Sequence, residues 1–164
     1  MTSQLVMESP VGPMRLAADD EAITQVMFAE PDAVLTDPGE EVSPLLSEAA
    51  RQLRAYFAGD LREFDLPVTS RGTAFQRRIW SELERIPYGV TSSYGEIAGR
   101  LGLPMGASRA VGTANGANPI AIVVPCHRVI GATGKLIGYA GGLERKKYLL
   151  NHESALVGQA PLFG

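Results

Sequence analysis

Residues 93–117 read SYGEIAGRLGLPMGASRAVGTANGA and predict two short helices joined by a glycine-containing turn. Ser93 and Glu96 have the spacing of a capping box, so a helix is expected to open at Ser93 and to continue as far as Leu101. Two glycines and a proline in residues 102–106 predict the turn. Residues 107–117 are expected to form the second helix. The pattern is that of a helix-turn-helix, although ordinary helical hairpins share it.

The second of these helices consists almost entirely of small residues, and Arg109 is its only charged residue. A smooth helix can bring its backbone very close to another surface. Its two glycines lower its intrinsic stability by about 1 kcal/mol each relative to alanine, which points to a need for close approach. The surface approached is either another helix, with Arg109 reaching solvent, or DNA, with Arg109 in a groove.

The first half of the chain has the pattern of a small antiparallel sheet with one helix. Turn residues 9–13 separate two short apolar runs and predict a hairpin. Ser43 is expected to cap a helix that has Pro44 at its first position and ends at Gly59. This half shows no catalytic constellation, and a scaffold role is favoured. The expected strands are residues 5–8, 14–18 and 22–28.

A polar stretch at residues 69–72 predicts a boundary between two lobes, residues 1–70 and residues 71–164. Thr73 and Gln76 form another capping-box pattern that opens the second lobe with a helix ending before Pro87. The second lobe is expected to be mainly helical. The predicted fold class is therefore α+β.

Composition excludes several classes of protein. The 164 residues are 45% hydrophobic and 20% charged, with a mean hydropathy of +0.02, which is typical of a globular domain and not of a disordered chain. No apolar run approaches the ~20 residues of a membrane helix, and residues 1–10 lack the pattern of a secretory signal. A single cysteine, Cys126, excludes an internal disulfide and a four-thiolate zinc site. We therefore expect a cytoplasmic protein without a membrane partner.

The net charge of −3 divides unevenly along the chain. Residues 1–70 carry four arginines against thirteen acidic residues, a balance of −9. Residues 71–164 carry eleven basic residues against five glutamates, a balance of +6. A basic second half suggests contact with a polyanion, and an inert dipolar surface is the alternative.

Cys126 lies in the sequence Pro-Cys-His-Arg-Val at residues 125–129, after an apolar run at residues 120–124 that predicts a buried strand or an extended segment. A lone cysteine is usually an inert core residue. Here His127 and Arg128 follow it, and both can favour the nucleophilic thiolate. Adjacent residues of a strand point to opposite faces, so Cys126 and His127 can cooperate only if the chain turns or a water bridges them. The histidine also needs a carboxylate, and Glu153 is one of five candidate glutamates.

Other kinds of site find little support in the sequence. Five glycines punctuate residues 130–143 and predict a loop with unusual backbone angles or close ligand contact. No dinucleotide or P-loop motif is present. His127 and His152 are too few and wrongly spaced for a metal site.

With these motifs in order, the chain closely resembles the O6-alkylguanine-DNA alkyltransferases, also called methylated-DNA–protein-cysteine methyltransferases. The resemblance covers about residues 73–153, and residues 125–129 carry its most specific motif. The other matching segments are Arg109-Ala110-Val111-Gly112, Asn118-Pro119, Gly138-Tyr139 and Gly141-Gly142-Leu143.

The resemblance implies that the second lobe binds the minor groove of double-stranded DNA through its helix-turn-helix. Arg109 matches the arginine finger that fills the space of an extruded nucleotide, and Tyr94 matches the tyrosine that helps to rotate it outward. A monomer off DNA is expected, and cooperative assembly on DNA is left open. The other implied DNA-facing residues are Ala107, Ala110, Gly112, Thr113 and Ala114.

The resemblance also implies the chemistry. Cys126 matches the cysteine that accepts the alkyl group, and His127 with Glu153 matches the relay that deprotonates it through a water. Tyr94 is expected to protonate the leaving guanine. Asn118 matches a brace of the active-site loop, and Lys146 matches a lysine of the last helix. The positions implied to line the base pocket are Asn115, Pro125, Val129, Tyr139 and Ala140.

The expected function is therefore direct reversal of O6-alkylguanine, and of O4-alkylthymine as a further substrate, by irreversible transfer to Cys126. The target base lies inside the stack, so it must be flipped at a cost of a few kcal/mol. The thioether product is a poor leaving group and no second cysteine can resolve it, so each molecule should act once. No cofactor is expected. Zinc is not expected either, because the members that bind it in the first lobe use cysteines absent from this chain.

Two departures from the family pattern accompany the match. Ala140 replaces a serine common in the pocket loop, and the turn at residues 102–106 is one residue longer than in some relatives. Two alternatives remain open from the residues alone. One is a damage sensor that flips the base without transfer, and the other is a thiol hydrolase that uses Cys126 and His127.

Overall fold

The computed structural model describes residues 3–37 and 40–163. Its contacts divide the chain into two units, which are considered separately. The first unit is residues 1–71 with residues 119–123, and the second is residues 72–118 with residues 124–164. Residues 119–123 thus pack with the first unit, whereas the predicted boundary placed them in the second lobe. The fold class is α+β, as predicted.

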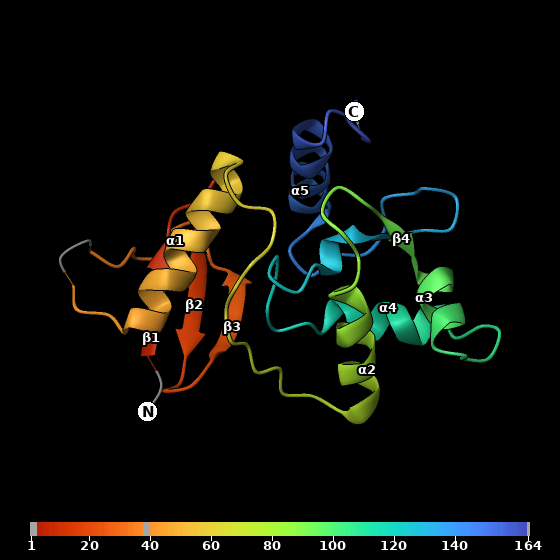
Figure 1. The fold of residues 1–164 in the computed structure, drawn as a ribbon, viewed down its shortest axis with the longest axis horizontal. Coiled ribbons are helices and arrows are strands. Elements are labelled where there is room, and N and C mark those ends of the chain that lie inside the picture. The colour runs from red at the N-terminus through yellow and green to blue at the C-terminus, as the bar shows by residue number, and fades with distance from the viewer. Residues whose placement is uncertain (1–2, 38–39, 164) are drawn as a thin grey trace. The chain divides into compact units, whose positions relative to one another are not determined.

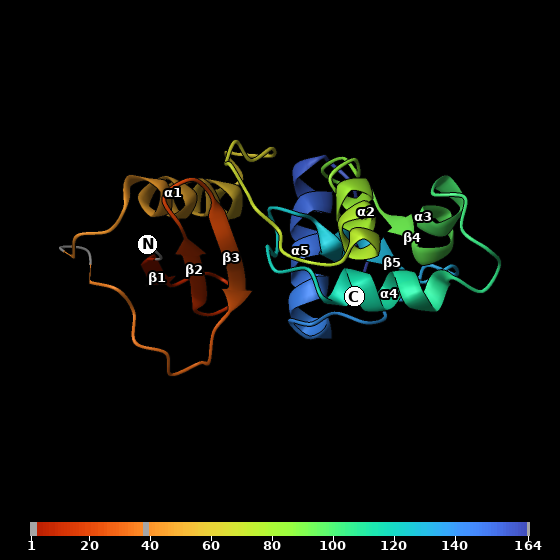
Figure 2. The ribbon, with the colours of Figure 1, turned by 90° about the horizontal axis from the view of Figure 1, so that it is seen from below.

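The first unit is a three-stranded antiparallel sheet covered on one face by a helix (Figures 1 and 2). The strands β1 (Ser3–Met7), β2 (Met14–Ala18) and β3 (Ile23–Phe28) pair in the order β1-β2-β3. Helix α1 (Pro44–Ala58) contacts the strands through one apolar face. The side chains that it buries include Leu46, Ala49, Leu53 and Tyr56. The unit therefore has a compact apolar core of its own, as a scaffold needs.

Both ends of α1 follow the sequence signals. The Ser43 hydroxyl accepts a hydrogen bond from the Leu46 amide, and Pro44 occupies the first turn, where its missing N–H has no partner to lose. Gly59 ends the helix with φ of 84°, a left-handed conformation that glycine adopts without steric strain.

The second unit is built mainly from helices. Helix α2 (Ala74–Leu83) begins at Thr73 with the predicted capping box, and α3 (Tyr94–Arg100) begins at Ser93 with another. Helix α4 (Ser108–Gly116) follows the turn, so the predicted helix-turn-helix is present. Helix α5 (Leu143–Leu156) closes the unit.

Short elements connect these helices at the centre of the unit. Strand β4 (Ser92–Ser93) pairs in parallel with β5 (Val129–Ile130), and the 3-10 helix η1 (Cys126–Arg128) directly precedes β5. Trp80 of α2 is buried, and its indole N–H donates to the Ala114 carbonyl of α4 at 2.9 Å. A Cβ on Gly72 would lie 2.5 Å from the Trp80 ring, so only glycine allows this close approach. These contacts fix α2 against α4.

The strand predicted at residues 120–124 is wrong. Ile120 forms one isolated bridge to Val26, and the chain then turns, with the Val123 amide donating to the Ala121 carbonyl at 2.8 Å. Ile122 between them has φ of 71° and is almost completely buried. It is the one non-glycine with positive φ in the described part of the chain, and that conformation is strained for a β-branched residue. Packing of the apolar side chains therefore overrides the local preference for a strand.

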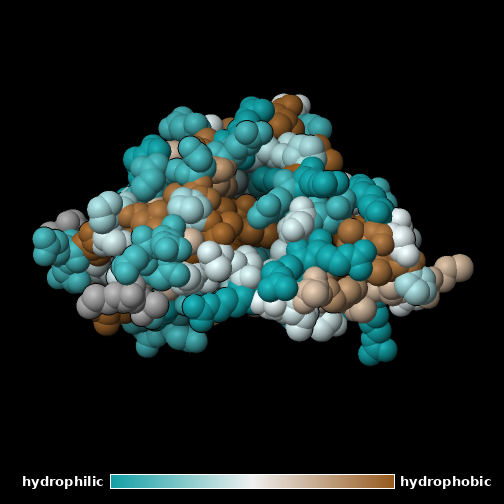
Figure 3. Space-filling model, turned by 60° about the horizontal axis from the view of Figure 1, so that its bottom comes forward, coloured by the Kyte–Doolittle hydropathy of each residue, from teal (hydrophilic) through white to brown (hydrophobic). Residues whose placement is uncertain are grey.

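Hydrophilic side chains cover most of the face drawn in Figure 3, and hydrophobic residues gather there in smaller patches. Among the large apolar side chains, Met105 in the α3–α4 turn and Val34 in the loop after β3 are the most exposed. Within the described residues, no helix combines the length and the apolar character needed to cross a membrane.

Candidate functional site

Cys126 sits where the chain turns sharply. The Cys126 amide donates to the Val124 carbonyl at 2.8 Å across Pro125, and η1 begins at the cysteine itself. Successive side chains of a 3-10 helix are rotated by about 120°, not by the 180° of a strand. Cys126 and His127 can therefore both face the interior, and both are buried, with His127 completely so. The turn removes the geometric objection raised by a strand.

Helix α4 and the residues that follow it hold η1 in place. The Asn115 side-chain N–H donates to the Cys126 carbonyl at 3.2 Å, and that of Asn118 donates to the Val124 carbonyl at 2.8 Å. Asn118 thus contacts the loop that it was expected to brace. Asn115, expected to line the pocket, also fixes the backbone of the cysteine.

His127 belongs to a buried ion cluster. Its Nε2 lies 2.7 Å from Oε2 of Glu153 on α5. The Arg128 guanidinium donates two hydrogen bonds to the same carboxylate, from Nε to Oε1 at 2.8 Å and from Nη2 to Oε2 at 3.1 Å. The Gly89 amide also donates to Oε1, at 3.3 Å. Of the five candidate glutamates, the structure therefore places Glu153 against the histidine.

Burial and charge set the ionisation of these groups. Burial acts to raise the pKa of Glu153, but the charges and hydrogen bonds of His127 and Arg128 outweigh it and hold that pKa well below its usual range. Burial lowers the pKa of His127, although Glu153 opposes the shift. Burial raises the pKa of the Cys126 thiol, although a hydrogen bond with Asn118 and the charge of Lys146 act to lower it. At neutral pH the site therefore holds a carboxylate, a neutral imidazole and a thiol that needs a base.

The two ring nitrogens of His127 are in different situations. Because Nε2 donates to a carboxylate, the neutral ring carries its proton there and leaves Nδ1 as an acceptor. Nδ1 is buried and has no hydrogen-bond partner among the described protein atoms. Nδ1 is therefore the ring atom that can take up a proton.

Tyr94 and Lys146 converge on the backbone of the loop before α5. The Tyr94 hydroxyl lies 3.1 Å from the Ile137 carbonyl, and the fully buried Lys146 ammonium donates to the same carbonyl at 2.8 Å and to that of Gly138 at 3.0 Å. Burial lowers the pKa of Lys146 to about 8 and raises that of Tyr94. The lysine thus holds the loop by two carbonyls, and Tyr94 remains protonated at neutral pH.

The remaining residues implied to line a base pocket lie in two segments. Pro125 and Val129 flank η1 and are buried. Tyr139 and Ala140 lie in the loop that Lys146 holds, and Ala140 is exposed. Burial and the nearby Cys126 raise the pKa of Tyr139, so its hydroxyl stays protonated. The structure thus brings one of these loop residues close to the thiol.

Helix α4 has one exposed face and one buried face. Arg109 is exposed in its first turn, together with Ala110 and Thr113, while Ala107 and Gly112 are partly exposed. A Cβ on Gly112 would make ordinary contact with the Tyr94 ring at 3.7 Å. Ala114 was expected to face DNA, but it is buried and its carbonyl accepts from Trp80. Ala114 therefore belongs to the contact between α4 and α2 and not to the exposed face of α4.

The part played by Arg128 was not predicted from the sequence. As a cation next to Cys126 it was expected to favour the thiolate. In the structure its guanidinium instead binds Glu153, donates to the Ile86 carbonyl at 2.7 Å and lies 5.6 Å from the centroid of the Tyr88 ring. A buried cation needs a carboxylate. The pairing of Arg128 with one of five glutamates was therefore the signal available in the sequence.

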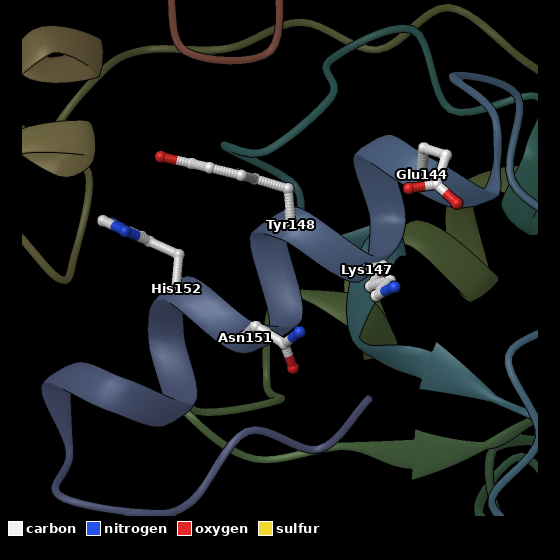
Figure 4. Close-up of a pocket in the computed structure, with 5 residues that line it drawn as sticks. All are labelled: Glu144, Lys147, Tyr148, Asn151 and His152. Atoms are coloured by element: carbon white, nitrogen blue, oxygen red, sulfur yellow. The ribbon is translucent and has the colours of Figure 1, made fainter. Parts of the chain in front are cut away.

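A separate hollow lies along α5, away from these groups (Figure 4). The Tyr148 and His152 rings are stacked there, with their centroids 6.0 Å apart. Glu144, Lys147 and Asn151 complete its described lining. None of these residues belongs to the thiol site. The described residues also hold no group of three or more histidine, cysteine, aspartate or glutamate side chains placed to bind a metal ion.

Comparison with known proteins covers nearly the whole chain. The family described as 6-O-methylguanine DNA methyltransferase, DNA binding domain, matches residues 74–155, and the ribonuclease-like domain of the same methyltransferase matches residues 4–69. The methylated-DNA–protein-cysteine methyltransferase of Methanosarcina acetivorans is 51% identical over 152 residues, covering 92% of this chain and 97% of that protein. The one of Mycobacterium bovis is 53% identical over 154 residues, with 90% of each covered.

Solved structures agree with the sequence comparison. The crystal structure of Mycobacterium tuberculosis O6-methylguanine methyltransferase aligns with a TM-score of 0.81 and 51% identity, covering 94% of each chain. The Mycobacterium tuberculosis OGT crystallised in complex with DNA aligns with a TM-score of 0.82 and 50% identity, over 97% of this chain and 95% of that one.

The Glu153→Gln substitution is expected to lower the free energy of unfolding by about 3 kcal/mol at pH 7, because buried Arg128 would lose its carboxylate. The pKa of Glu153 is lowered by folding, so its contribution is full above the unfolded pKa of about 4.3 and declines as the pH falls towards the folded pKa. Urea unfolding at pH 7, 5 and 3 measures the difference from wild type, which should shrink only at pH 3. Glu144→Gln, an exposed change on the same helix, is the control. An equal deficit at all three pH values would contradict the ion cluster.

Proposed function

The chain belongs to the 6-O-methylguanine DNA methyltransferase family, and from this premise we propose that Cys126 is the residue that accepts the alkyl group. The family's activity, carried by relatives over nearly the full length, is direct-reversal DNA repair by transfer to a cysteine of the protein. This chain is such a methyltransferase. The observation that carries the assignment is the cysteine count, since Cys126 is the only cysteine in the sequence.

Deprotonation of the thiol is the first task, because burial raises the pKa of Cys126. The unprotonated Nδ1 of His127 is the base, and a bridging water carries the proton to it. Glu153, 2.7 Å from Nε2, stabilises the imidazolium that forms. Asn118 and Lys146, which favour the ionised form of Cys126, then stabilise the thiolate.

Transfer follows by direct displacement. The Cys126 sulfur attacks the alkyl carbon, a sulfur–carbon bond forms, and the carbon–oxygen bond to O6 of guanine breaks. The electron pair of that bond stays with guanine, which takes up a proton donated by the Tyr94 hydroxyl. Tyr94 regains its proton from the imidazolium through the pocket water, so the thiol proton ends on guanine. The thioether has no resolving thiol in this chain, and each molecule is consumed by one reaction.

Tyr94 must change partner for this role. In the free protein its hydroxyl contacts the Ile137 carbonyl. Lys146 already donates to that carbonyl, so the tyrosine can leave it without depriving it of a hydrogen-bond donor. Entry of the guanine between Tyr94 and the loop therefore exchanges one hydrogen bond for another.

DNA is the partner, and the proposed interface is the exposed face of α4 in the minor groove. That face presents Arg109 among small residues, so the helix backbone can come close to the duplex. Arg109 enters the stack where the alkylated guanine has been extruded, since its planar cation can stack and donate hydrogen bonds to neighbouring bases. The net charge of +6 over residues 71–164 attracts the phosphates to this unit.

A hydrolase that uses Cys126 and His127 is disfavoured by the family comparison, which assigns the surrounding residues 74–155 to a DNA-binding domain. A sensor without transfer is disfavoured because the relatives that match nearly the full length are methylated-DNA–protein-cysteine methyltransferases and this chain has a cysteine at residue 126.

Incubation with a duplex containing O6-methylguanine should add the mass of one methyl group to the peptide that contains Cys126, measured by mass spectrometry after digestion. The Cys126→Ser variant should bind the same duplex and gain no mass. Modification of any other peptide, or an unmodified protein after complete contact with substrate, would overturn the assignment. Binding of the duplex by the wild-type protein without a mass change would favour the sensor. Continued turnover of an ester by the wild-type protein after a burst would favour the hydrolase.

Arg109→Ala should slow repair of duplex DNA by about tenfold or more and leave the reaction with free O6-benzylguanine nearly unchanged. Only the duplex requires extrusion, which costs a few kcal/mol, and each 1.4 kcal/mol corresponds to about a tenfold effect. Single-turnover rates on the two substrates measure the difference. Arg85→Ala removes another exposed cation of the same unit and serves as the control. Equal losses on duplex and free base would exclude the finger role.

A further inference from the structure

The buried carboxylate of Glu153 interacts with two side chains, those of His127 and Arg128. Glu153 receives Nε2 of His127 at 2.7 Å and two donors of Arg128 at 2.8 and 3.1 Å. The side chains of His127, Arg128 and Glu153 are 0%, 7% and 1% exposed, so water screens these charges little. Burial is the largest effect that lowers the pKa of His127, and Arg128 adds to it by opposing the effect of Glu153.

A carboxylate alone would make His127 a poor base in the resting protein. An opposite charge at this distance raises the pKa of an imidazole by about 1–3 units and favours the protonated ring. A ring that already carries both protons cannot accept another from a thiol. Arg128 brings a permanent positive charge to the same carboxylate, and the pair is neutral overall.

We propose that Arg128 is a positioning residue that keeps His127 neutral, with Nδ1 unprotonated and available as the base for Cys126. The inference rests on the proposed roles of Cys126 and His127 in alkyl transfer. Arg128 touches neither the thiol nor the substrate in this arrangement, and it acts through Glu153.

The arginine is itself held from several sides. Nη1 donates to the Ile86 carbonyl at 2.7 Å, and the guanidinium lies 5.6 Å from the centroid of the Tyr88 ring. The planar group thus bridges the segment before β4 to α5. A fixed position matters because the electrostatic effect on His127 falls with distance.

The other charged or titratable groups that act on His127 do not replace Arg128. Cys126 on η1 carries no charge while it is a thiol. Lys146 on α5 contributes a lowering effect on the histidine pKa smaller than that of Arg128. Its ammonium is engaged with the Ile137 and Gly138 carbonyls. Arg128 is thus the cation that shares a carboxylate with the histidine.

NMR titration of the histidine rings tests the inference without any alkyl transfer. The chain has only two histidines, His127 and His152, so a His152→Gln background leaves one ring to follow. In that background His127 should titrate below the ordinary range of a histidine, and its neutral ring should be the Nε2–H tautomer. Arg128→Met should raise its pKa by about 1–3 units. Arg128→Lys, which keeps the charge, should leave the pKa close to wild type.

A second leg of the thermodynamic cycle repeats the measurement without the carboxylate. The double variant Arg128→Met with Glu153→Gln should have a higher His127 pKa than Glu153→Gln alone. The single variant keeps the positive charge of Arg128, which disfavours protonation of the imidazole, and the double variant lacks it. This comparison serves if Arg128→Met alone fails to fold. An unchanged His127 pKa in either leg would overturn the proposal.

The pH dependence of single-turnover transfer gives a second readout. Arg128→Met should be slower than wild type at pH 6 and should recover most of the loss by pH 9, because the neutral fraction of His127 falls about tenfold for each unit by which its pKa exceeds the pH. A purely structural role would slow transfer equally at every pH, and that result would overturn the proposal. If wild type transfers nothing, the proposed function fails, while the NMR titration still decides the role of Arg128.

Discussion

The carboxylate of Glu153 is the constraint on which the rest of the site depends. It is buried, so its charge must be matched, and the structure matches it with Arg128 and a hydrogen bond from His127. Both partners lie on η1, the 3-10 helix that also carries Cys126. Through this one group, α5 is joined to η1 and to the backbone at Gly89. The 3-10 turn that carries Cys126 is therefore fixed by an ion cluster that lies behind it.

This arrangement separates the reactive group from the groups that control it. The thiol is nearly buried and its pKa is raised, so it remains protonated until a base acts on it. Glu153 holds His127, and Lys146 holds the loop that brings Tyr139 close to the thiol. A cysteine that can react only once benefits from such protection, because reaction with any other electrophile would consume the protein. In the proposed mechanism, substrate entry moves the Tyr94 hydroxyl from the loop to the guanine.

Local signals in the sequence were sufficient for the helices and their caps. The capping boxes at Thr73 and Ser93, the Pro44 start and the Gly59 end of α1 all involve residues within one turn of each other. The features that sequence reasoning missed depend on contacts between distant residues. Burial of Ile122 in a strained turn replaces the expected strand, and the contact of Trp80 with the Ala114 carbonyl decides which face of α4 is buried.

The site likewise combines features predicted from local sequence with contacts between distant residues. The motif at residues 125–129 pointed to the thiol and its histidine, and the resemblance pointed to Glu153 and Tyr94. The pairing of Arg128 with Glu153 spans 25 residues, and the meeting of Tyr94 with the Ile137 carbonyl spans 43. No spacing rule reports such contacts, so the electrostatic control of His127 became visible only in three dimensions.

The stoichiometry of repair tests the central claim most directly. A duplex carrying radiolabelled O6-methylguanine is supplied in excess over protein, and the label bound to protein is followed with time. We expect a plateau at about one methyl group per chain, with no label released to solvent, because the thioether on Cys126 cannot be resolved by this chain. Repair that continues past one equivalent, or label that leaves the protein, would contradict a single irreversible transfer to Cys126.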